Sequence, residues 1–269
     1  MSNGVSQLEN RDWKFKNNVR VIGGLTGGGT RYQLEEFFNQ RPGLNASMAQ
    51  AFTDADATAA ANTAISLART VANKNFEILG TNASADDITF ATTDAGILCT
   101  LDGGDNDQII VLPHLDTNQT AWTGVVWGTE NQVEWECAIK TGSEVSHVLI
   151  WAGLKLTNTP TIATDADQVM FRFSTDDADT TWRCVDSIAN TDVNTDSGIT
   201  VAAATWYRLR IKILSSRAAE FYINDVLIHR TQELTNDVNL IPYIGIQSLS
   251  AAADTLGIGY EKISRILFE

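Results

Sequence analysis

The sequence predicts an all-β protein, an antiparallel sandwich that follows an extended or helical N-terminal arm. From residue 75 onward, short runs of alternating apolar and polar residues recur at close intervals, and clusters of Asp, Asn, Gly and Thr separate them. No strand–helix–strand rhythm interrupts this region, and 4 prolines leave the strands few rigid breaks. The expected strands are residues 76–79, 88–91, 97–101, 108–112, 124–127, 133–139, 147–156, 168–173, 182–186, 206–214, 219–223, 226–229, 241–247 and 258–268.

The chain is long enough for one large β domain behind a shorter N-terminal segment. Its 269 residues are 43% hydrophobic and 19% charged, a composition typical of a globular protein with a sizeable core. We therefore divide it into an arm at 1–45, an Ala-rich helix or linker at 46–75, and a β-sandwich at 76–269. The N-terminus lacks a basic and apolar leader, and no window reaches the roughly 18 apolar residues of a membrane span. We expect assembly in a cytoplasm and no membrane partner.

The arm contains short elements separated by glycines. Residues 19–22 form a strand-like run, and residues 23–30 then hold five glycines. Because this stretch lacks both a Gly-Lys-Ser/Thr ending and GxGxxG spacing, we interpret it as a flexible or closely packed connector, not a nucleotide site. Residues 32–38 predict a short amphipathic helix that residues 41–43 (Arg-Pro-Gly) end. The Ala-rich residues 47–73 predict either one helix or a linker.

Charge is distributed unevenly along the chain. The formal net charge is −14, and a nucleic-acid partner is disfavoured because phosphate binding needs a basic face. Residues 1–45 carry six basic and four acidic side chains, a net of +2, whereas the remaining 13 basic and 29 acidic side chains give −16. This asymmetry predicts a separate partner for the arm with an acidic or mixed surface. An ordinary terminus with chance charges is the alternative interpretation.

Two of the expected strands have one apolar and one charged face. In residues 206–213, side chains alternate between an apolar set and a basic set, namely Tyr207, Leu209, Ile211 and Ile213 against Arg208, Arg210 and Lys212. In residues 133–139, the apolar row alternates with two acids, namely Val133, Trp135, Cys137 and Ile139 against Glu134 and Glu136. If these polar faces adjoin in one sheet, the acids and bases pair across the strands, each exposed pair contributing about 0.2–1 kcal/mol.

Cysteine and histidine spacing predicts neither a zinc site nor a hydrolytic triad. The cysteines lie far apart in strand-like runs, and we interpret Cys99, Cys137 and Cys184 as reduced core residues. The histidines are scattered and no Gly-x-Ser-x-Gly accompanies them, namely His114, His147 and His229. His147 is expected on a strand, as a hydrogen-bonded structural residue.

Two acidic loops are the candidate metal sites, and calcium is the metal that they fit best. Ca²⁺ takes six to eight oxygen ligands, and each loop offers several carboxylates, although neither matches the twelve-residue EF-hand pattern. The candidates are Asp102, Asp105 and Asp107 in one loop and Asp176, Asp177 and Asp179 in the other. Asp is also a common turn residue for local hydrogen-bonding reasons, so turn structure without a metal is the alternative.

Residues 206–228 resemble a hairpin typical of concanavalin A-like jelly rolls. In that family an amphipathic strand is followed by a second strand with a "YING"-type turn and a short return strand. Asp225 stands where that turn has glycine, and a type I′ turn needs positive φ at both central residues, so we expect a longer or distorted turn. The resemblance implies a jelly-roll core at about 107–269, with residues 257–268 as a terminal strand that pairs near residues 108–112.

Shorter strings resemble structural proteins of tailed bacteriophages, especially marine and cyanobacterial ones. These strings are residues 107–119, 127–130, 150–158 and 240–247. In that group, such jelly rolls decorate the virion. A glycine-rich, mildly basic arm before an acidic β domain also suits a capsid-binding anchor.

The leading hypothesis is therefore a non-enzymatic capsid decoration or cement protein on the virion exterior. Its arm would bind the major capsid protein or another virion protein, and the β domain would face outward in a homo-oligomer, with a trimer favoured. No cofactor is expected beyond the calcium alternative. The candidate capsid contacts are Arg11, Trp13, Lys14, Lys16, Arg20, Arg31, Tyr32, Phe37 and Phe38. The arm, residues 1–45, is expected to be removable without unfolding the β domain.

Two other functions compete with this hypothesis. A tail or fibre protein would bind host glycans through exposed aromatics such as Trp122, Trp127, Trp151 and Trp182. Large aromatics usually fill a sandwich core, however, and those of the two strands analysed above are already assigned there. Jelly rolls of this type also include glycoside hydrolases, and Glu134 and Glu136 come closest to their carboxylate pattern, although the intervening Asp and a third carboxylate are absent. Two carboxylates beside a basic strand are more simply a solvated face.

Overall fold

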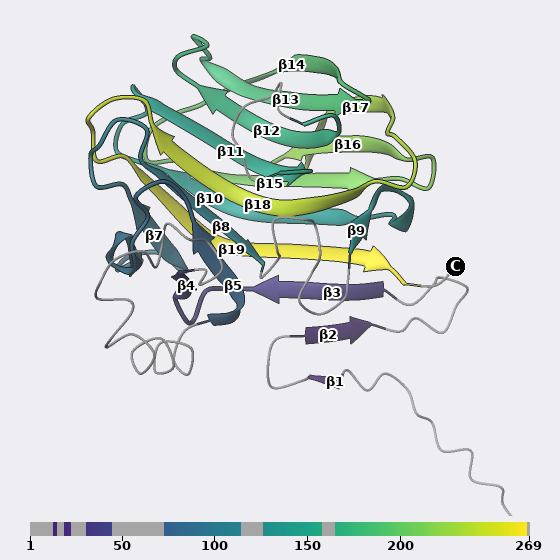
Figure 1. Ribbon diagram of the computed structural model, residues 1–269, viewed down its shortest axis with the longest axis horizontal. Helices are drawn as coiled ribbons and strands as arrows, with labels where there is room; N and C mark the ends of the chain where they lie inside the picture. Colours follow the sequence, from purple (N-terminus) through teal and green to yellow (C-terminus); the bar gives the residue numbers. More distant parts are fainter. Residues whose placement is uncertain are drawn as a thin grey trace, which may run out of the picture.

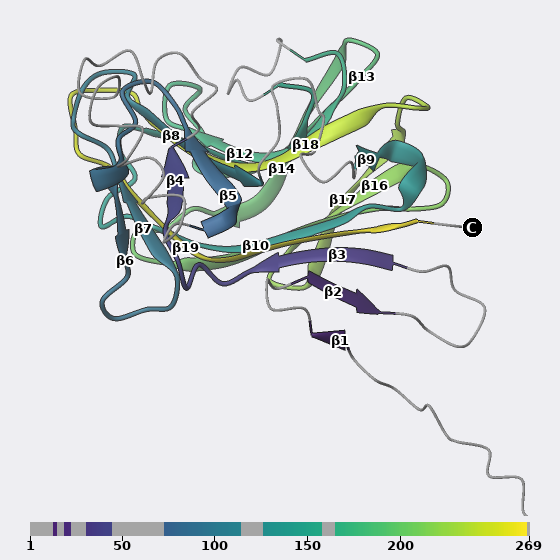
Figure 2. The same cartoon turned by 60° about the horizontal axis from the view of Figure 1, so that its bottom comes forward.

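Two β-sheets packed face to face make up the computed structural model, which describes residues 13–14, 19–22, 31–44, 73–113, 126–157 and 165–267. Figure 2 shows the two layers, with β12, β14 and β18 in one and β3, β10 and β19 in the other. All strand pairs are antiparallel except the one between β4 and β5. The predicted all-β antiparallel sandwich is therefore confirmed.

The first sheet has ten strands, and the short strands β1 and β2 at one edge come from the N-terminal region (Figure 1). In spatial order its main path is β1 (Trp13–Lys14), β2 (Val19–Ile22), β3 (Arg31–Glu36), β19 (Thr255–Ile266), β10 (Glu134–Thr141), β15 (Trp206–Ile213), β16 (Ala218–Ile223) and β17 (Val226–Glu233). Off this path, β7 (Ile97–Thr100) pairs with β19, and β6 (Ile88–Phe90) pairs with β7.

The second sheet has nine strands. Its main path is β14 (Thr191–Thr200), β13 (Thr181–Ile188), β12 (Gln168–Ser174), β11 (Val148–Lys155), β18 (Asn239–Ser248), β8 (Gln108–Pro113), β5 (Asn73–Leu79) and β4 (Pro42–Leu44). The short β9 (Trp127–Gly128) pairs with β18. Two single-turn 3₁₀ helices, η1 (Ala85–Asp87) and η2 (Thr129–Asn131), lie between strands. No helix among the described residues is long and apolar enough to cross a membrane.

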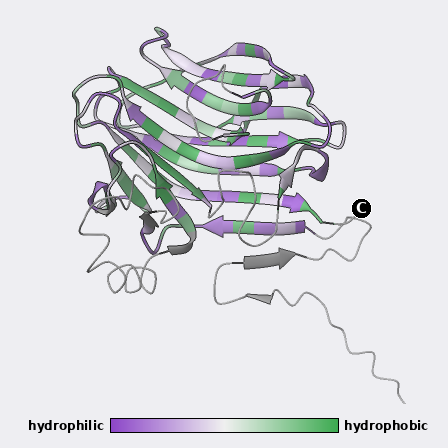
Figure 3. Ribbon diagram, in the orientation of Figure 1, coloured by the Kyte–Doolittle hydropathy of each residue, from purple (hydrophilic) through white to green (hydrophobic). Residues whose placement is uncertain are grey.

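The predicted faces of β10 and β15 are confirmed. The two strands pair in register, with Glu134 opposite Lys212 and Glu136 opposite Arg210 on the solvent side. Arg210 Nη1 lies 3.6 Å from Glu134 Oε1, an ion pair of the kind expected between these polar faces. The intervening side chains of both strands are buried, and Figure 3 shows the alternation of hydrophobic and hydrophilic residues along the strands.

Aromatic pairs join the inner faces of the two sheets. The rings of Phe171 on β12 and Phe221 on β16 meet edge to face with centroids 5.2 Å apart. Trp182 on β13 and Tyr207 on β15 meet similarly at 5.4 Å. All four side chains are buried. Each buried large apolar side chain contributes about 1.5–3 kcal/mol, so these contacts hold the layers in one relative position.

The three cysteines are buried and free, as predicted. Loss of hydration raises the pKa of the Cys99 and Cys137 thiols far above the usual range, and raises that of Cys184 to about 12. Thiols in this environment stay protonated and unreactive at neutral pH. They act as small core side chains.

The second sheet also buries apolar side chains on its outer face, so its central strands are covered on both sides. A second cluster there consists of Leu79, Ile110, Leu112, Trp151, Met170, Val185, Ile241 and Tyr243. Gly245 makes room for the indole of Trp151, because a β-carbon at Gly245 would lie 2.4 Å from Trp151 Cζ2. This burial explains why the sequence of β18 is almost continuously apolar.

The helix predicted at residues 32–38 is wrong, because most of this segment forms strand β3. Leu34 and Glu36 point inward and are buried, while Gln33 and Glu35 lie between them on the outer side. The segment is short enough to fit either period, and an open edge of β19 provides the backbone partners that decide in favour of a strand.

One expected strand pairing is wrong, and one strand was not expected. The C-terminal strand β19 pairs with β10, β3 and β7 in the first sheet, not with residues 108–112, and β8 instead pairs with β18 and β5. The β14 strand was not predicted, because none of its residues is buried and no apolar alternation marks it. Its ten residues are held by backbone pairing to β13 at the edge of the second sheet.

Two local predictions are corrected by the backbone. Asn224 and Asp225 both adopt positive φ (50° and 66°), and Ile223 pairs directly with Val226, so the turn is a regular two-residue turn despite the missing glycine. Both Asn and Asp tolerate the left-handed conformation better than other non-glycine residues. His147 precedes β11 instead of lying on it, and its side chain is exposed.

Of the elements predicted in the N-terminal region, one is confirmed and two lie outside the described residues. The strand-like run at 19–22 is β2. The glycine-rich connector at 23–30 lies outside the described residues, as does the Ala-rich segment up to residue 72.

One carboxyl group is buried in the interior beside β10. Glu261 on β19 lies opposite Cys137 and Glu36 in the register, and its Oε1 accepts a hydrogen bond from Trp135 Nε1 at 2.7 Å. Its Oε2 finds no hydrogen-bond partner among the described residues. Burial raises the pKa of Glu261 to about 8, and the Trp135 hydrogen bond opposes this only in part. Glu261 is therefore protonated at neutral pH.

The Glu261→Gln variant should become progressively more stable than the wild type as the pH rises. Above about pH 4.5 the unfolded chain releases the Glu261 proton while the folded chain keeps it up to about pH 8, so the wild type loses stability through this window. The difference in unfolding free energy between the two proteins should grow by about 1.4 kcal/mol per pH unit. Urea unfolding at pH 5, 6, 7 and 8 measures it, and parallel pH profiles would contradict a raised pKa at this position.

Candidate functional site

The N-terminal strands form an edge that extends the first sheet away from the sandwich. β3 pairs with β19, β2 with β3, and β1 with β2, so the chain adds three strands in succession (Figures 1 and 2). Among the described residues β1 pairs only with β2. No strand within the described ranges covers the outer side of β1, and an uncovered edge of this kind is what proteins use when they bind by strand addition.

Two of the expected capsid contacts, Arg31 and Tyr32, also fasten this edge to the sandwich. Arg31 Nη2 donates to Ser264 Oγ at 2.9 Å and to the Gln132 carbonyl at 3.0 Å. The ring of Tyr32 lies against the ring of Trp127, with centroids 5.8 Å apart. Both residues therefore have a structural role, and their role as partner contacts stays a prediction.

Phe37 and Phe38, which are adjacent in sequence, have opposite environments. Phe38 is buried and meets Phe76 edge to face at 5.4 Å, with its N–H donating to Glu36 Oε1 at 2.6 Å. Phe37 is 49% exposed on the outer face of the sheet. Of the other expected contacts, Trp13, Lys14 and Arg20 lie on β1 and β2, whereas Arg11 and Lys16 lie outside the described residues.

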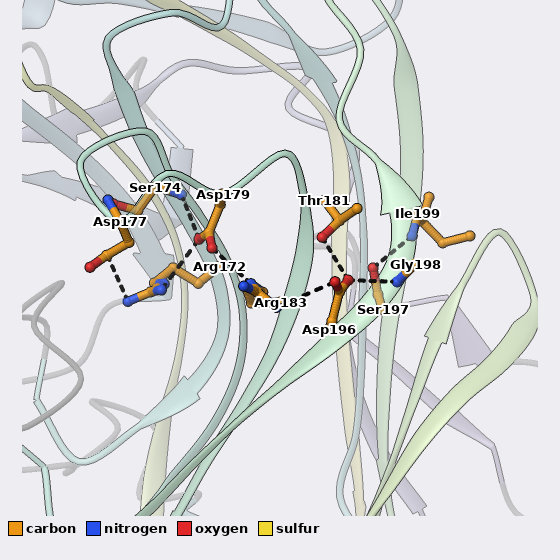
Figure 4. Close-up of polar contacts among 10 residues, drawn as sticks. All are labelled: Arg172, Ser174, Asp177, Asp179, Thr181, Arg183, Asp196, Ser197, Gly198 and Ile199. Atoms are coloured by element: carbon orange, nitrogen blue, oxygen red, sulfur yellow. Dashed lines mark hydrogen bonds and ion pairs between the residues drawn. The ribbon is translucent and has the colours of Figure 1, made fainter.

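The loop at residues 174–179 is organised by arginines. Asp179 Oδ1 accepts from Arg183 Nε at 2.7 Å, and Asp179 Oδ2 accepts from the Ser174 N–H at 3.1 Å and Arg172 Nη2 at 3.3 Å (Figure 4). Asp177 Oδ2 pairs with Arg172 Nη1 at 2.9 Å. Two of the three calcium candidates of this loop, Asp177 and Asp179, are thus paired with guanidinium groups. The third candidate, Asp176, is exposed.

The same network continues to the edge strand β14. Arg183 Nη1 lies 3.5 Å from Asp196 Oδ2, and Asp196 Oδ1 accepts from Thr181 Oγ1 at 2.6 Å and from the Gly198 N–H at 2.8 Å (Figure 4). These hydrogen bonds, with Thr181 as the largest cause, lower the pKa of Asp196. Ion pairing therefore ties the largely polar β14 to β13, in addition to the partly buried Ile199, which packs against the core.

The other acidic loop is likewise held by internal hydrogen bonds. Asp107 is buried and accepts from Asn82 Nδ2 at 2.7 Å and from the Gly104 N–H at 2.7 Å, while Asp102 and Asp105 are exposed. Across the described ranges, no group of three or more His, Cys, Asp or Glu side chains is placed to hold a metal ion. Turn structure accounts for the Asp content of both loops.

The described tryptophans considered for sugar binding are buried, whereas the two glutamates considered for catalysis lie on an outer face. Trp127, Trp151 and Trp182 are buried, so their rings cannot stack on a sugar from solvent, and Trp122 lies outside the described residues. Glu134 and Glu136 point outward from β10, as expected.

Both glutamates are already engaged on that face. Glu134 pairs with Arg210, and Glu136 accepts a hydrogen bond from the Tyr260 hydroxyl. Burial, and after it the hydrogen bond to Glu136, raises the pKa of Tyr260. The pair lies on an open sheet face in contact with bases and a phenol, which is the solvated arrangement that the sequence favoured over a catalytic one.

Comparison with solved structures shows the concanavalin A-like jelly-roll fold. A protein of unknown function, SO2946 from Shewanella oneidensis MR-1, superposes with a TM-score of 0.56 and 13% identity over 91% of this chain and 90% of that one. A Bacillus licheniformis β-glucanase gives 0.52 and 11% identity, over 88% and 98% of the two chains. A Bacteroides ovatus mixed-linkage glucan GH16 protein in complex with a product gives 0.50 and 7% identity, over 71% and 94%.

A family model described as SO2946-like, C-terminal domain, matches residues 117–240. This stretch runs from β9 through the start of β18 and includes the predicted hairpin. No curated protein matches the sequence. At these identities the solved structures define the fold alone, and none of the three is described as a virion component.

Replacing Asp179 should destabilise the domain, because Asp179 balances two guanidinium groups in a buried position. We expect Asp179→Asn to lower the unfolding free energy by about 3 kcal/mol, since Arg172 would remain buried with only the exposed Asp177 as its partner. Urea unfolding measures the change.

The matched control is Asp176→Asn in the same loop, where an exposed carboxylate is removed and a change within about 0.5 kcal/mol is expected. Equal stabilities for the two variants would show that the network does not hold the loop.

Proposed function

We propose that this protein is a non-enzymatic structural component of a bacteriophage virion, a capsid decoration or cement protein. The observation that carries the proposal is the N-terminal edge, where β1 and β2 project beyond the sandwich and where β1, in the part of the chain that the structure describes, pairs with β2 alone. Strand addition gives affinity through main-chain hydrogen bonds and suits attachment to a large protein surface. The proposed partner is the major capsid protein or another virion protein.

The distribution of charge supports attachment through the N-terminal edge. The chain after residue 45 carries a net −16, whereas residues 1–45 carry +2, so the sandwich repels other acidic surfaces more strongly than the N-terminal region does. With the N-terminal edge against the shell, the acidic sandwich would face outward on the virion exterior. A closed homo-oligomer, with a trimer favoured, would repeat this contact around a symmetry axis.

The proposal of a non-enzymatic role rests on the state of the candidate carboxylates. Retaining glycoside hydrolysis needs one carboxyl group with a raised pKa and a free carboxylate about 5–5.5 Å away. Glu134 is instead paired with a guanidinium and Glu136 with a phenol, both on an open face. The fold is shared with glucanases, but a shared fold does not imply shared chemistry.

The strands at the N-terminal edge determine which deletions can test attachment to the capsid. Residues 31–44, which we had placed in the arm, supply β3, β4 and the buried Phe38, so removing residues 1–45 takes strands from both sheets. Removing residues 1–30 takes only β1 and β2. The two truncations therefore separate attachment from folding.

Deletion of residues 1–30 should leave a folded sandwich that no longer binds capsids. We expect cooperative unfolding within about 1 kcal/mol of the full chain, because all core residues that the structure describes lie after residue 30, together with loss of co-sedimentation with shells that lack the protein. Deletion of residues 1–45 should instead lower stability by several kcal/mol, through loss of Phe38 and of the β3 pairing. Undiminished co-sedimentation of the 1–30 truncation would contradict the proposed attachment.

A further inference from the structure

A lysine and an aspartate are buried together at one end of the second sheet. Lys155 is the last residue of β11, and Asp165 lies just before β12, the neighbouring strand (Figure 1). Lys155 Nζ is 3.4 Å from Asp165 Oδ2, and neither side chain is exposed to solvent. A fully buried lysine is rare in proteins, because an ammonium group loses its hydration there.

Apolar residues of the second cluster lie next to this pair. Lys155 is on the same face of β11 as Trp151, and its register partner on β18 is Ile241. Burial, and after it the charge of Asp165, raises the pKa of Tyr243, which places the carboxyl group beside the same cluster. The amine and the carboxyl group therefore meet in surroundings of low polarity, where charges are costly.

The contact between the two groups is not that of an optimal ion pair. At 3.4 Å it is longer than the about 2.7–2.9 Å of a strong charge-assisted hydrogen bond. Burial lowers the pKa of Lys155, although Asp165 and, after it, Asp192 on β14 oppose this. Transfer of a proton from the lysine to the carboxylate removes both charges and leaves an amine beside a carboxylic acid. These are the two reactants of an amide bond.

The carboxyl group of Asp165 is held in one orientation. Its Oδ1 accepts a hydrogen bond from Thr157 Oγ1 at 2.7 Å, and its Oδ2 accepts one from the Thr157 N–H at 3.1 Å. Reacting groups that are held together in this way behave as if at a very high local concentration. A donor at Oδ1 also stabilises the negative charge that develops on this oxygen when a nucleophile adds to Cγ.

We infer that Lys155 and Asp165 become joined by an amide bond between Nζ and Cγ, an intramolecular isopeptide cross-link. Nζ first transfers one proton to Oδ2, and its lone pair then adds to Cγ. The bond between Cγ and Oδ2 breaks, and Oδ2 takes a second proton from Nζ and leaves as water. The reaction needs no oxidant and no further reactant, and it replaces two buried charges by one neutral amide.

The cross-link closes the connection between β11 and β12 into a covalent ring of residues 155–165. A closed loop restricts the unfolded chain and so favours the folded state. This modification goes beyond the proposed capsid attachment and does not depend on it, because it lies in the second sheet, whereas β1 and β2 extend the first. Its test measures covalent structure and leaves the attachment proposal unaffected whatever the result.

The test is mass spectrometry of the full chain after denaturation. We expect an intact mass that is lower than the sequence mass by one water molecule. In a tryptic digest, cleavage after Lys155 should be lost, because trypsin needs a free lysine side chain, and residues 141–172 should appear as one peptide. This peptide should give no backbone fragments between residues 155 and 165, because the cross-link holds both halves together.

Lys140 is the matched control within the same digest. It forms an ion pair with Asp94 at the shorter distance of 2.7 Å, but both side chains are about one-third exposed. The hydrogen bond from Lys140 lowers the pKa of Asp94, so this carboxylate stays ionised and does not react with the amine. Cleavage after Lys140 should therefore be complete. A cross-link at Lys155 alone would show that burial, and not proximity by itself, drives the reaction.

Two variants test the role of the amine. Lys155→Arg keeps a cation but cannot form the bond, because a guanidinium group is not deprotonated in proteins, and Lys155→Met removes the amine without adding a charge. Both should have their full sequence mass, and urea unfolding checks that they fold. The wild-type peptide map decides the question even where a variant does not fold. The full sequence mass in the wild type after prolonged incubation at neutral pH, or a water loss that maps outside residues 155–165, would overturn the inference.

Discussion

The pairing of β19 between β10 and β3 is the interaction on which the rest of the molecule depends. The last strand of the chain lies inside the first sheet and bonds to three others, so both the middle and the N-terminal part of the sequence need it as a partner. Without β19, β3 would have no edge to join and the N-terminal strands would not extend the sheet. Long-range pairing of this kind costs loop entropy before it is repaid by contacts.

Charged side chains are placed differently in the two sheets. On the outer face of the first sheet, acids and bases alternate across strands and stay in contact with water, where each pair contributes little. The second sheet contains buried ions, and these come with partners. Lys155 lies 3.4 Å from Asp165 with both side chains fully buried, and Arg172 lies between Asp177 and Asp179. Among the described residues, Glu261 has no charged partner to offset its burial in the core of the sandwich, and it avoids the cost of a buried charge by keeping its proton.

The predictions succeeded where one face of a strand meets the core and the other meets water. β10 and β15 show this alternation over their full length, and their partnership could be anticipated from complementary charges. The prediction failed where that contrast is missing. β14 has no buried residue and depends on backbone pairing, and β3 is too short for its period to separate strand from helix. The structural contact of Arg31 could not be foreseen either, because a lone basic residue gives no hint of a carbonyl supplied by Gln132.

The sequence by itself determined the all-β class, the location of most strands, the buried and reduced cysteines and the division between a mildly basic N-terminal region and an acidic β domain. These properties follow from local periodicity and composition, which each segment carries with it. Only the tertiary structure decided which strands are neighbours, and with that the position of the open edge and the exposure of individual aromatics. Four of the seven tryptophans, Trp127, Trp135, Trp151 and Trp182, are buried, while Trp206 lies on the surface over a glycine two strands away. The physical reason is that burial of a ring depends on the strand beside it, and that strand is distant in the chain.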